Sequence, residues 1–210
     1  MGTCSDGCGA RAVEASSAPA YVRALWLVVM MNGGMFILGV VASILSGSVS
    51  VRSDMLDFLG DSIATGIGLI LVGRSARVRA TASLWQGVVL GMLGAFALVT
   101  ALARFWSGEP PEALEMGLYG VLGLAVNTGA ALLLLRHRHG DANVRAVWLY
   151  SRNDALGNIA VLIAAVAVVI TNSKLPDIIA GVAIAFLFSH SAYGIVNQAR
   201  RDKAALSLES

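Results

Sequence analysis

Residues 48–73, SVSVRSDMLDFLGDSIATGIGLILVG, join a charged half to an apolar half. The second half is apolar enough to lie in lipid, whereas the first half carries Asp54, Asp57 and Asp61. Asp57 and Asp61 stand four residues apart, so on a helix they lie on one face about one turn apart. Each carboxylate costs about 2.5–3.5 kcal/mol at the middle of a membrane, and the two negative charges repel each other. The pair therefore needs a neutralising positive charge, which is either a bound cation or protons.

The whole chain is apolar. It has 210 residues, of which 57% are hydrophobic and 13% are charged, whereas a soluble domain has about 25% charged residues. Its net charge of +2 is too small to suggest a nucleic-acid partner. The composition predicts an all-α, polytopic integral membrane protein in a lipid bilayer, rather than a soluble, alanine-rich helical protein. Charge-free intervals close to the roughly 20 residues of a spanning helix occur at 24–51, 80–103, 116–135, 155–173 and 178–199.

Six transmembrane helices fit this pattern, and their many small residues would let them approach closely. Arginine and lysine gather before the first span, after the second, after the fourth and after the last, which predicts that both termini are cytoplasmic. Residues 1–20 would be a flexible cytoplasmic tail, 21–200 the six-helix transmembrane domain, and 201–210 a short cytoplasmic tail with no soluble domain after it. The spans are expected at residues 21–45, 50–73, 78–105, 112–135, 143–170 and 176–198.

The fifth span carries a second polar stripe within WLYSRNDALGNIAVL, residues 148–162. Tyr150, Asp154 and Asn158 recur every four residues and so share a helix face, and Asn153 flanks Asp154. Carboxylates together with amide oxygens can form an oxygen-rich shell around a divalent cation. The alternative is that Asp154 only forms a structural salt bridge with Arg152. The predicted metal site comprises Asp57, Asp61, Tyr150, Asn153, Asp154 and Asn158.

Four other polar residues in the spans each have two interpretations. Asn32 in the first span either forms a hydrogen bond between helices or lines the ion path, and the same holds for Asn127 in the fourth. Asp54 either stabilises the outer end of its helix or lies on the path. Asp177, at the start of the sixth span, either caps that helix or acts as a gate near the outer mouth.

Two further sets of ligand-type residues lie outside the spans. His137 and His139, with Asp141 in the same loop, would capture metal weakly on the cytoplasmic side or simply form a solvated basic loop. Cys4 and Cys8 are separated by three residues, not by the two of many zinc sites. The two thiolates either capture a soft metal or belong to a disordered tail with no metal-binding role.

Ligands for a redox or other organic cofactor are not apparent. A membrane enzyme or redox subunit would need, for example, paired histidines on facing helices. His190 is the only histidine within a predicted span. We therefore expect no organic cofactor and no enzymatic activity.

Three motifs resemble, in order and spacing, those of the cation diffusion facilitator family. They are SILSGSVSVRSDMLDFLGDSIATGIGL at 43–69, SRNDALGNIAVLIAA at 151–165 and LPDIIAGVAIA at 175–185. The resemblance covers about residues 21–200. It implies a homodimeric antiporter that moves divalent metal out of the cytoplasm against protons, by alternating access around a mid-membrane site. The family's four site positions fall here on Asp57, Asp61, Tyr150 and Asp154.

Two departures from the family pattern bear on the metal and on assembly. Zinc-type members usually carry histidine at the position of Tyr150, and tyrosine is a poor neutral ligand, so Asn158, Asn153 or water would complete the shell. An oxygen-rich shell suits manganese or iron(II). The cysteine tail and the usual substrates of the family favour zinc or cadmium, which we therefore expect as the main substrates. We also expect no cytoplasmic domain of the kind usual in the family, so a dimer would form through the membrane helices. We expect a bacterial inner-membrane protein, with a regulatory protein that binds metal without transporting it as the alternative.

Overall fold

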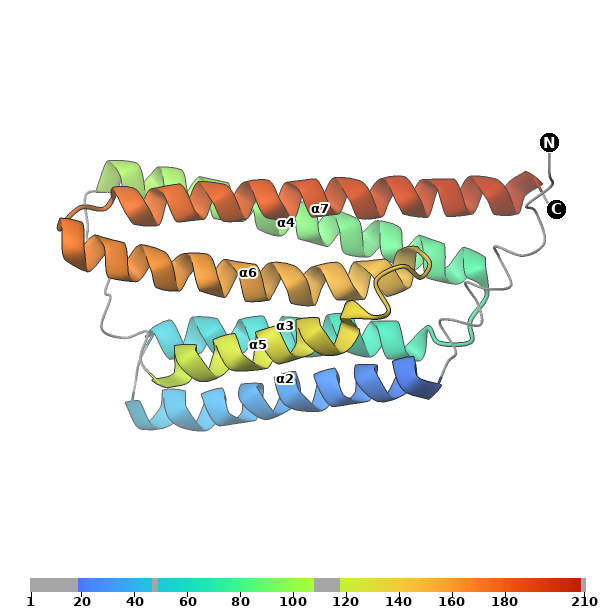
Figure 1. Ribbon diagram of the computed structural model, residues 1–210, viewed down its shortest axis with the longest axis horizontal. Helices are drawn as coiled ribbons and strands as arrows, with labels where there is room; N and C mark the ends of the chain where they lie inside the picture. Colours follow the sequence, from blue (N-terminus) through green and yellow to red (C-terminus); the bar gives the residue numbers. More distant parts are fainter. Residues whose placement is uncertain (1–18, 47–48, 108–117, 209–210) are drawn as a thin grey trace.

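The computed structural model describes residues 19–46, 49–107 and 118–208, and every regular element in these ranges is an α-helix. Six helices run alongside one another, and the first residues of α2 lie at the same end of the bundle as the last residues of α7 (Figure 1). We call this the basic end, because Arg74, Arg136 and Arg138 lie in or beside its loops. The helices are α2 (Pro19–Ser46), α3 (Val49–Ile70), α4 (Ala76–Ser107), α5 (Leu118–Leu135), α6 (Ala142–Thr171) and α7 (Leu175–Leu208).

The predicted all-α, six-helix organisation is confirmed. The helix ends agree with the predicted spans to within about three residues, apart from the start of α5 and the end of α7. The predicted start of the fourth span at residue 112 and the tail at 1–18 lie outside the described residues. Helix α7 continues to Leu208, whereas the prediction ended its span at residue 198, so most of the expected 201–210 tail is helical.

Four of the helices are long and apolar enough to cross a membrane, at Pro19–Ala42, Ala76–Ala103, Ala142–Thr171 and Leu175–Leu208. Helix α5 adds the shorter apolar stretch Val121–Leu135, and α3 is the helix whose first half carries the charged residues. Large apolar side chains are exposed on the outside of the bundle. Because such a surface is stable in lipid and not in water, the chain is a multi-pass membrane protein.

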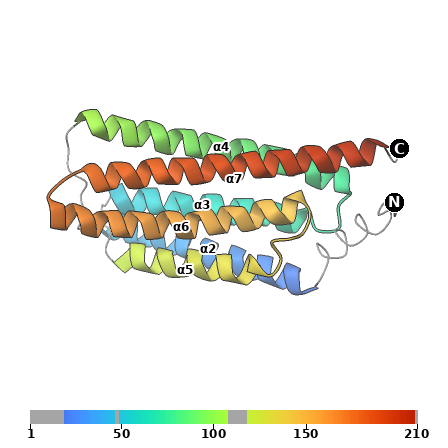
Figure 2. The same ribbon diagram turned by 45° about the horizontal axis from the view of Figure 1, so that its top comes forward.

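Helix α6 lies in the middle of the bundle, between the α4 and α7 pair on one side and α2 and α5 on the other (Figures 1 and 2). One buried apolar cluster joins α6 to α2 and α5 and includes Leu25, Leu134 and Val147. A second cluster joins α6 to α4 and α7 and includes Leu149 and Ile195. Since both clusters use α6, the packing on its two sides sets which of its faces remains for polar residues.

Glycine allows α4 and α7 to pack closely along much of their length. A Cβ atom on Gly94 would lie 2.9 Å from Oγ of Ser189 and 3.1 Å from the carbonyl oxygen of Ala185. A Cβ atom on Gly181 would lie 2.8 Å from Cβ of Ala101. The expectation that small residues bring the helices together is therefore met at this pair, where van der Waals packing replaces the hydrophobic effect.

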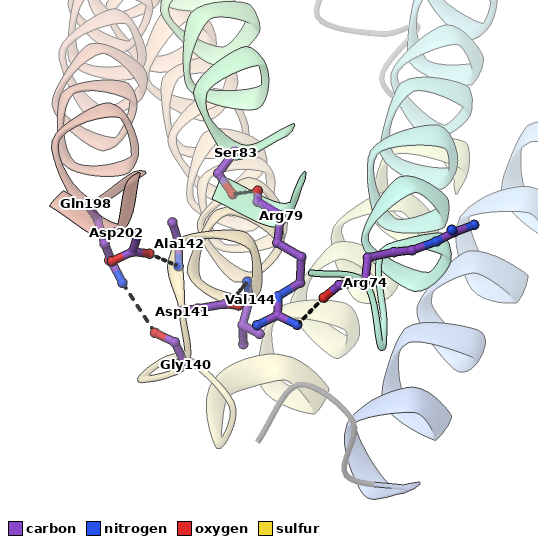
Figure 3. Close-up of polar contacts among 9 residues, drawn as sticks. All are labelled: Arg74, Arg79, Ser83, Gly140, Asp141, Ala142, Val144, Gln198 and Asp202. Carbon is purple, nitrogen blue, oxygen red and sulfur yellow. Dashed lines mark hydrogen bonds and ion pairs between the residues drawn. The ribbon is translucent and has the colours of Figure 1, made fainter. Parts of the chain in front are cut away.

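A buried ion pair joins α4 to α6 at the basic end (Figure 3). Arg79 of α4 is only 1% exposed, and its Nε donates to Oδ2 of Asp141 over 2.6 Å. Its Nη1 also donates to the carbonyl oxygen of Arg74 over 2.9 Å. Oδ1 of Asp141 accepts from the backbone N–H of Val144, so this carboxylate caps α6 as well as holding α4.

The C-terminal part of α7 is held to the start of α6 (Figure 3). Oδ2 of Asp202 accepts from the backbone N–H of Ala142 over 3.1 Å, and Nε2 of Gln198 donates to the carbonyl oxygen of Gly140 over 3.3 Å. Oε1 of Gln198 accepts from Arg145 over 2.8 Å. These bonds explain why α7 passes residue 198: the apolar pattern ends there, but the polar side chains that follow have partners on α6.

We predict that Arg79→Ala lowers the free energy of unfolding by about 3–5 kcal/mol, because it leaves the Asp141 carboxylate without its cation in a largely buried site. Denaturant unfolding of the purified protein in detergent measures this change. The control is Arg77→Ala, two residues away on the exposed face of α4, which should change stability by no more than about 0.5 kcal/mol. Equal losses in the two variants would contradict the structural role of the Arg79 pair.

Candidate metal centre

A cavity of about 850 Å³ lies between α3, α4, α5 and α6, and α7 contributes Ile184 and Phe188 to its lining. It takes lining residues from both of the polar stripes that the sequence singled out. The structure thus brings five of the six predicted metal-site residues around one cavity, and leaves out Asn153. Those five are Asp57 and Asp61 from α3, and Tyr150, Asp154 and Asn158 from α6.

Asp61 and Asp154 lie at similar depths in the bundle. Asp61 is nine residues from Ile70 at the end of α3, which is about 14 Å at the helical rise of 1.5 Å per residue. Asp154 is twelve residues from Ala142 at the start of α6, which is about 18 Å. Both of these helix ends belong to the basic end (Figure 1). The two side chains therefore meet near the middle of a hydrocarbon layer about 30 Å thick.

The carboxyl groups of Asp61 and Asp154 face each other closely enough to share a hydrogen bond. Oδ2 of Asp154 is buried and has no hydrogen-bond partner in the described part of the chain. Asp57 lines the same cavity and acts electrostatically on both groups, but it is exposed. Within residues 19–46, 49–107 and 118–208, no three His, Cys, Asp or Glu side chains are grouped to hold a metal ion. The arrangement is a converging carboxyl pair with a third carboxylate beside it, not a closed shell of three.

Tyr150 lines the cavity but directs its hydroxyl group to α4. The hydroxyl donates to the carbonyl oxygen of Gln86 over 2.7 Å, and Tyr150 is only 8% exposed. This bond ties the middle of α6 to α4 next to the carboxyl pair. Tyr150 therefore acts in this structure as a link between two helices that line the cavity.

Asn153 faces away from the cavity, toward α7. It is fully buried, and its Oδ1 accepts from Arg152 over 2.8 Å and from Ser191 over 3.2 Å. The guanidinium group of Arg152 also lies 5.2 Å from the centre of the Trp148 ring. Among the described residues, Arg152 forms no ion pair with Asp154, so the structural salt bridge considered from the sequence is absent there.

Of the residues considered for the ion path, Asn127 lines the cavity, whereas Asn32 and Asp177 do not. Asn32 is buried on α2, outside the cavity lining, and its Oδ1 has no hydrogen-bond partner among the residues that the structure describes. Asp177 lies in the first turn of α7, where a negative charge interacts favourably with the helix N-terminus. The side chain of Asp54 lies outside the described part of the structure.

The histidines of the 136–141 loop are already in contact with neighbouring side chains. Nε2 of His137 accepts from Arg136 over 3.2 Å, and Nε2 of His139 accepts from Arg138 over 2.9 Å. Burial lowers the pKa of His137, and the charge of Arg136 lowers it further. The structure thus shows a basic loop with neutral His137, in which a metal would have to displace arginine. Cys4 and Cys8 lie outside the described residues.

Two amide side chains line the cavity that were not part of the predicted site. Gln86 of α4 and Asn127 of α5 are 7% and 5% exposed. Asn127 carried only the general signal of an amide in an apolar span. Gln86 carried the same signal, but neither a carboxylate nor a second amide shares its face of α4 to mark it as part of an ion site. Its position opposite α6 is set by how the helices pack, and the sequence of a single span does not predict this packing.

Known proteins share most of this chain's sequence pattern. A family model described as the cation efflux transmembrane domain matches residues 25–202. The chain is 27% identical to a cadmium, cobalt and zinc/H(+)-K(+) antiporter of Bacillus velezensis, over 82% of this chain and 60% of that protein. It is 28% identical to the zinc transporter ZitB of Pectobacterium atrosepticum, over 76% and 54%. It is 29% identical to ZitB of Escherichia coli, over 79% and 57%. The chain therefore spans little more than half the length of these relatives.

We predict that Tyr150→Phe lowers the free energy of unfolding by about 1 kcal/mol, because it removes a buried hydrogen bond between α6 and α4. The matched control is Tyr193→Phe, which changes a tyrosine that is 69% exposed on α7 and should leave stability nearly unchanged. Denaturant unfolding of both variants in the same detergent measures the difference. If the two substitutions have the same effect, the hydroxyl of Tyr150 does not stabilise the contact with Gln86.

Proposed function

The chain belongs to the cation efflux family, and from this we propose that it exports divalent metal cations from the cytoplasm in exchange for protons. The observation that carries the proposal is the pair of facing carboxyl groups, Asp61 and Asp154, in a cavity that Asp57 also lines. The family is one of transporters, so the cavity has a role in carrying an ion, and an enzymatic role is not needed to explain it. Proton coupling and alternating access are the parts that we add.

The exchange follows from the chemistry of the carboxyl pair. Two carboxylates this close in an apolar bundle cannot both remain charged without a cation, so an empty site takes up protons. Metal binding then releases these protons, which makes the affinity depend on pH. When the loaded site opens to the outside, protons there compete for the same oxygens and release the metal. The protonated site has little charge and returns inward, by a rocking of helices as in other alternating-access carriers.

We propose zinc or cadmium as the first substrates. The names of the relatives refer to zinc, cadmium and cobalt. Manganese or iron(II) is the second candidate, because no imidazole or thiol group is among the described residues that line the cavity. Carboxylate and carbonyl oxygens suit manganese, whereas thiolate and imidazole ligands suit zinc.

We also propose an orientation in the membrane and an assembly. We infer that the basic end faces the cytoplasm, because arginine and lysine are enriched in cytoplasmic loops. The membrane is then the inner membrane of a bacterium, as expected for a chain whose relatives above are bacterial. A homodimer formed through the membrane helices is the expected assembly.

Transport into proteoliposomes with an acidic lumen tests the function. We expect zinc or cadmium to enter as protons leave, and uptake to stop when the pH gradient is collapsed. Asp154→Asn should reduce uptake to the level of protein-free vesicles, because the amide can neither carry the charge nor exchange the proton. Manganese, iron(II) and cobalt complete the panel.

The control for this experiment is Asp202→Asn, which makes the same chemical change in α7 outside the cavity. Its amide oxygen can still accept from the backbone N–H of Ala142, so this variant should retain uptake. If the wild-type protein moves none of the five metals, transport is refuted. Binding of these metals without uptake would favour the regulatory, non-transporting alternative.

A further inference from the structure

The side-chain amide of Gln86 is buried in the cavity without a partner. Gln86 is 7% exposed, and neither its Oε1 nor its Nε2 has a hydrogen-bond partner in the described part of the chain. Asn127, on the α5 side of the same cavity, is 5% exposed, and its Oδ1 likewise lacks a partner there. Buried polar groups in native proteins are nearly always hydrogen-bonded, so each exception needs a physical reason. The presence of two such amides in one cavity indicates a shared ligand.

The backbone of Gln86 is held in place from the other side of the cavity. The hydroxyl group of Tyr150 donates to the carbonyl oxygen of Gln86 over 2.7 Å. Tyr150 lies one helical turn before Asp154, so this bond fixes α4 at the level of the carboxyl pair. The side chain of Gln86 therefore starts from a backbone position that α6 itself determines.

The acidic residues alone leave the cation shell incomplete. Asp61 and Asp154 converge, but the described residues contain no group of three or more His, Cys, Asp or Glu side chains suited to a metal ion. Divalent cations take four or more ligands, and amide oxygens are among those that hard cations accept. Among the residues that line the cavity, Gln86 and Asn127 carry buried amide oxygens without a partner in the described part of the chain.

We propose that Gln86, with Asn127 as a second amide, supplies the neutral oxygen ligands of the cation that Asp61 and Asp154 bind, and that Tyr150 is the residue that positions Gln86. The identity of this cation as the transported ion rests on the function proposed above. Because amide oxygens are harder ligands than imidazole, this shell makes the site more favourable to manganese, relative to zinc, than a site with a histidine in their place.

Calorimetric titration of the full chain in detergent with Mn²⁺ and with Cd²⁺ tests the proposal. Gln86→Leu and Gln86→Met should weaken binding of both ions, by about 10-fold or more for Mn²⁺, the scale on which loss of a supporting ligand acts. Gln86→His should strengthen Zn²⁺ binding relative to Mn²⁺. The matched control is Ser83→Ala, which removes a buried polar group one turn earlier on α4, outside the cavity, where the hydroxyl bonds to the backbone of Arg79. It should leave affinity unchanged.

Thermal unfolding without and with metal separates ligation from a structural role. If Gln86 is a ligand, Gln86→Leu leaves the metal-free midpoint unchanged or raises it, because an unpaired buried amide is removed. The upward shift of the midpoint on adding Mn²⁺ then becomes smaller. A lower metal-free midpoint with an unchanged metal-induced shift would overturn the proposal, as would unchanged affinity in both Gln86→Leu and Gln86→Met.

Binding and transport measured on the same variants keep this inference distinct from the proposed function. If wild-type protein binds Mn²⁺ or Cd²⁺ through Gln86 but moves neither across proteoliposomes, the ligand assignment stands and the transport function fails. If wild-type protein transports metal and Gln86→Leu retains both affinity and the wild-type metal preference, the ligand assignment fails and transport stands.

Discussion

The facing carboxyl groups of Asp61 and Asp154 are the constraint on which this structure depends. They lie inside a bundle whose surface and core are mostly apolar, where a lone negative charge is costly and two adjacent ones are more so. The charge can be balanced only by protons or by a cation. The helices that carry the two groups, α3 and α6, must therefore be in contact at the same depth, and a space for the ion must remain beside them. The cavity between α3, α4, α5 and α6 meets that requirement.

The central position of α6 follows from the same constraint. One face of α6 packs with α2 and α5, and another packs with α4 and α7. The face that carries Tyr150, Asp154 and Asn158 is left to line the cavity. At the basic end, Asp141 caps α6 and also binds the buried Arg79, so the helix is held at its start as well as along its sides. A movement that opens the cavity would have to keep these contacts or exchange them together.

The polar residues that line the cavity come from more helices than the two with carboxylates. The hydroxyl of Tyr150, which lines the cavity, donates to the backbone carbonyl of Gln86. Gln86 and Asn127 then present amide groups that lack partners among the described residues. Tyrosine at this position therefore differs from histidine in two ways. It changes one potential metal ligand, and its hydroxyl also binds the backbone of α4 across the cavity. Metal preference would then be a property of α4 and α5 together with α6.

The sequence by itself determined the six helices and the polar faces of α3 and α6, since both follow from local regularities. A long apolar run can satisfy its backbone in lipid only as a helix, and a spacing of four residues puts Asp57 with Asp61, and Tyr150 with Asp154, on one face. Only the tertiary structure decided that Asn153 faces α7, that α7 continues to Leu208, and that Gln86 lines the same cavity as the carboxyl pair. These outcomes depend on contacts between residues that lie tens of positions apart in the chain. No regularity within a single helix encodes such contacts, because they arise when helices pack and bury each other's polar groups.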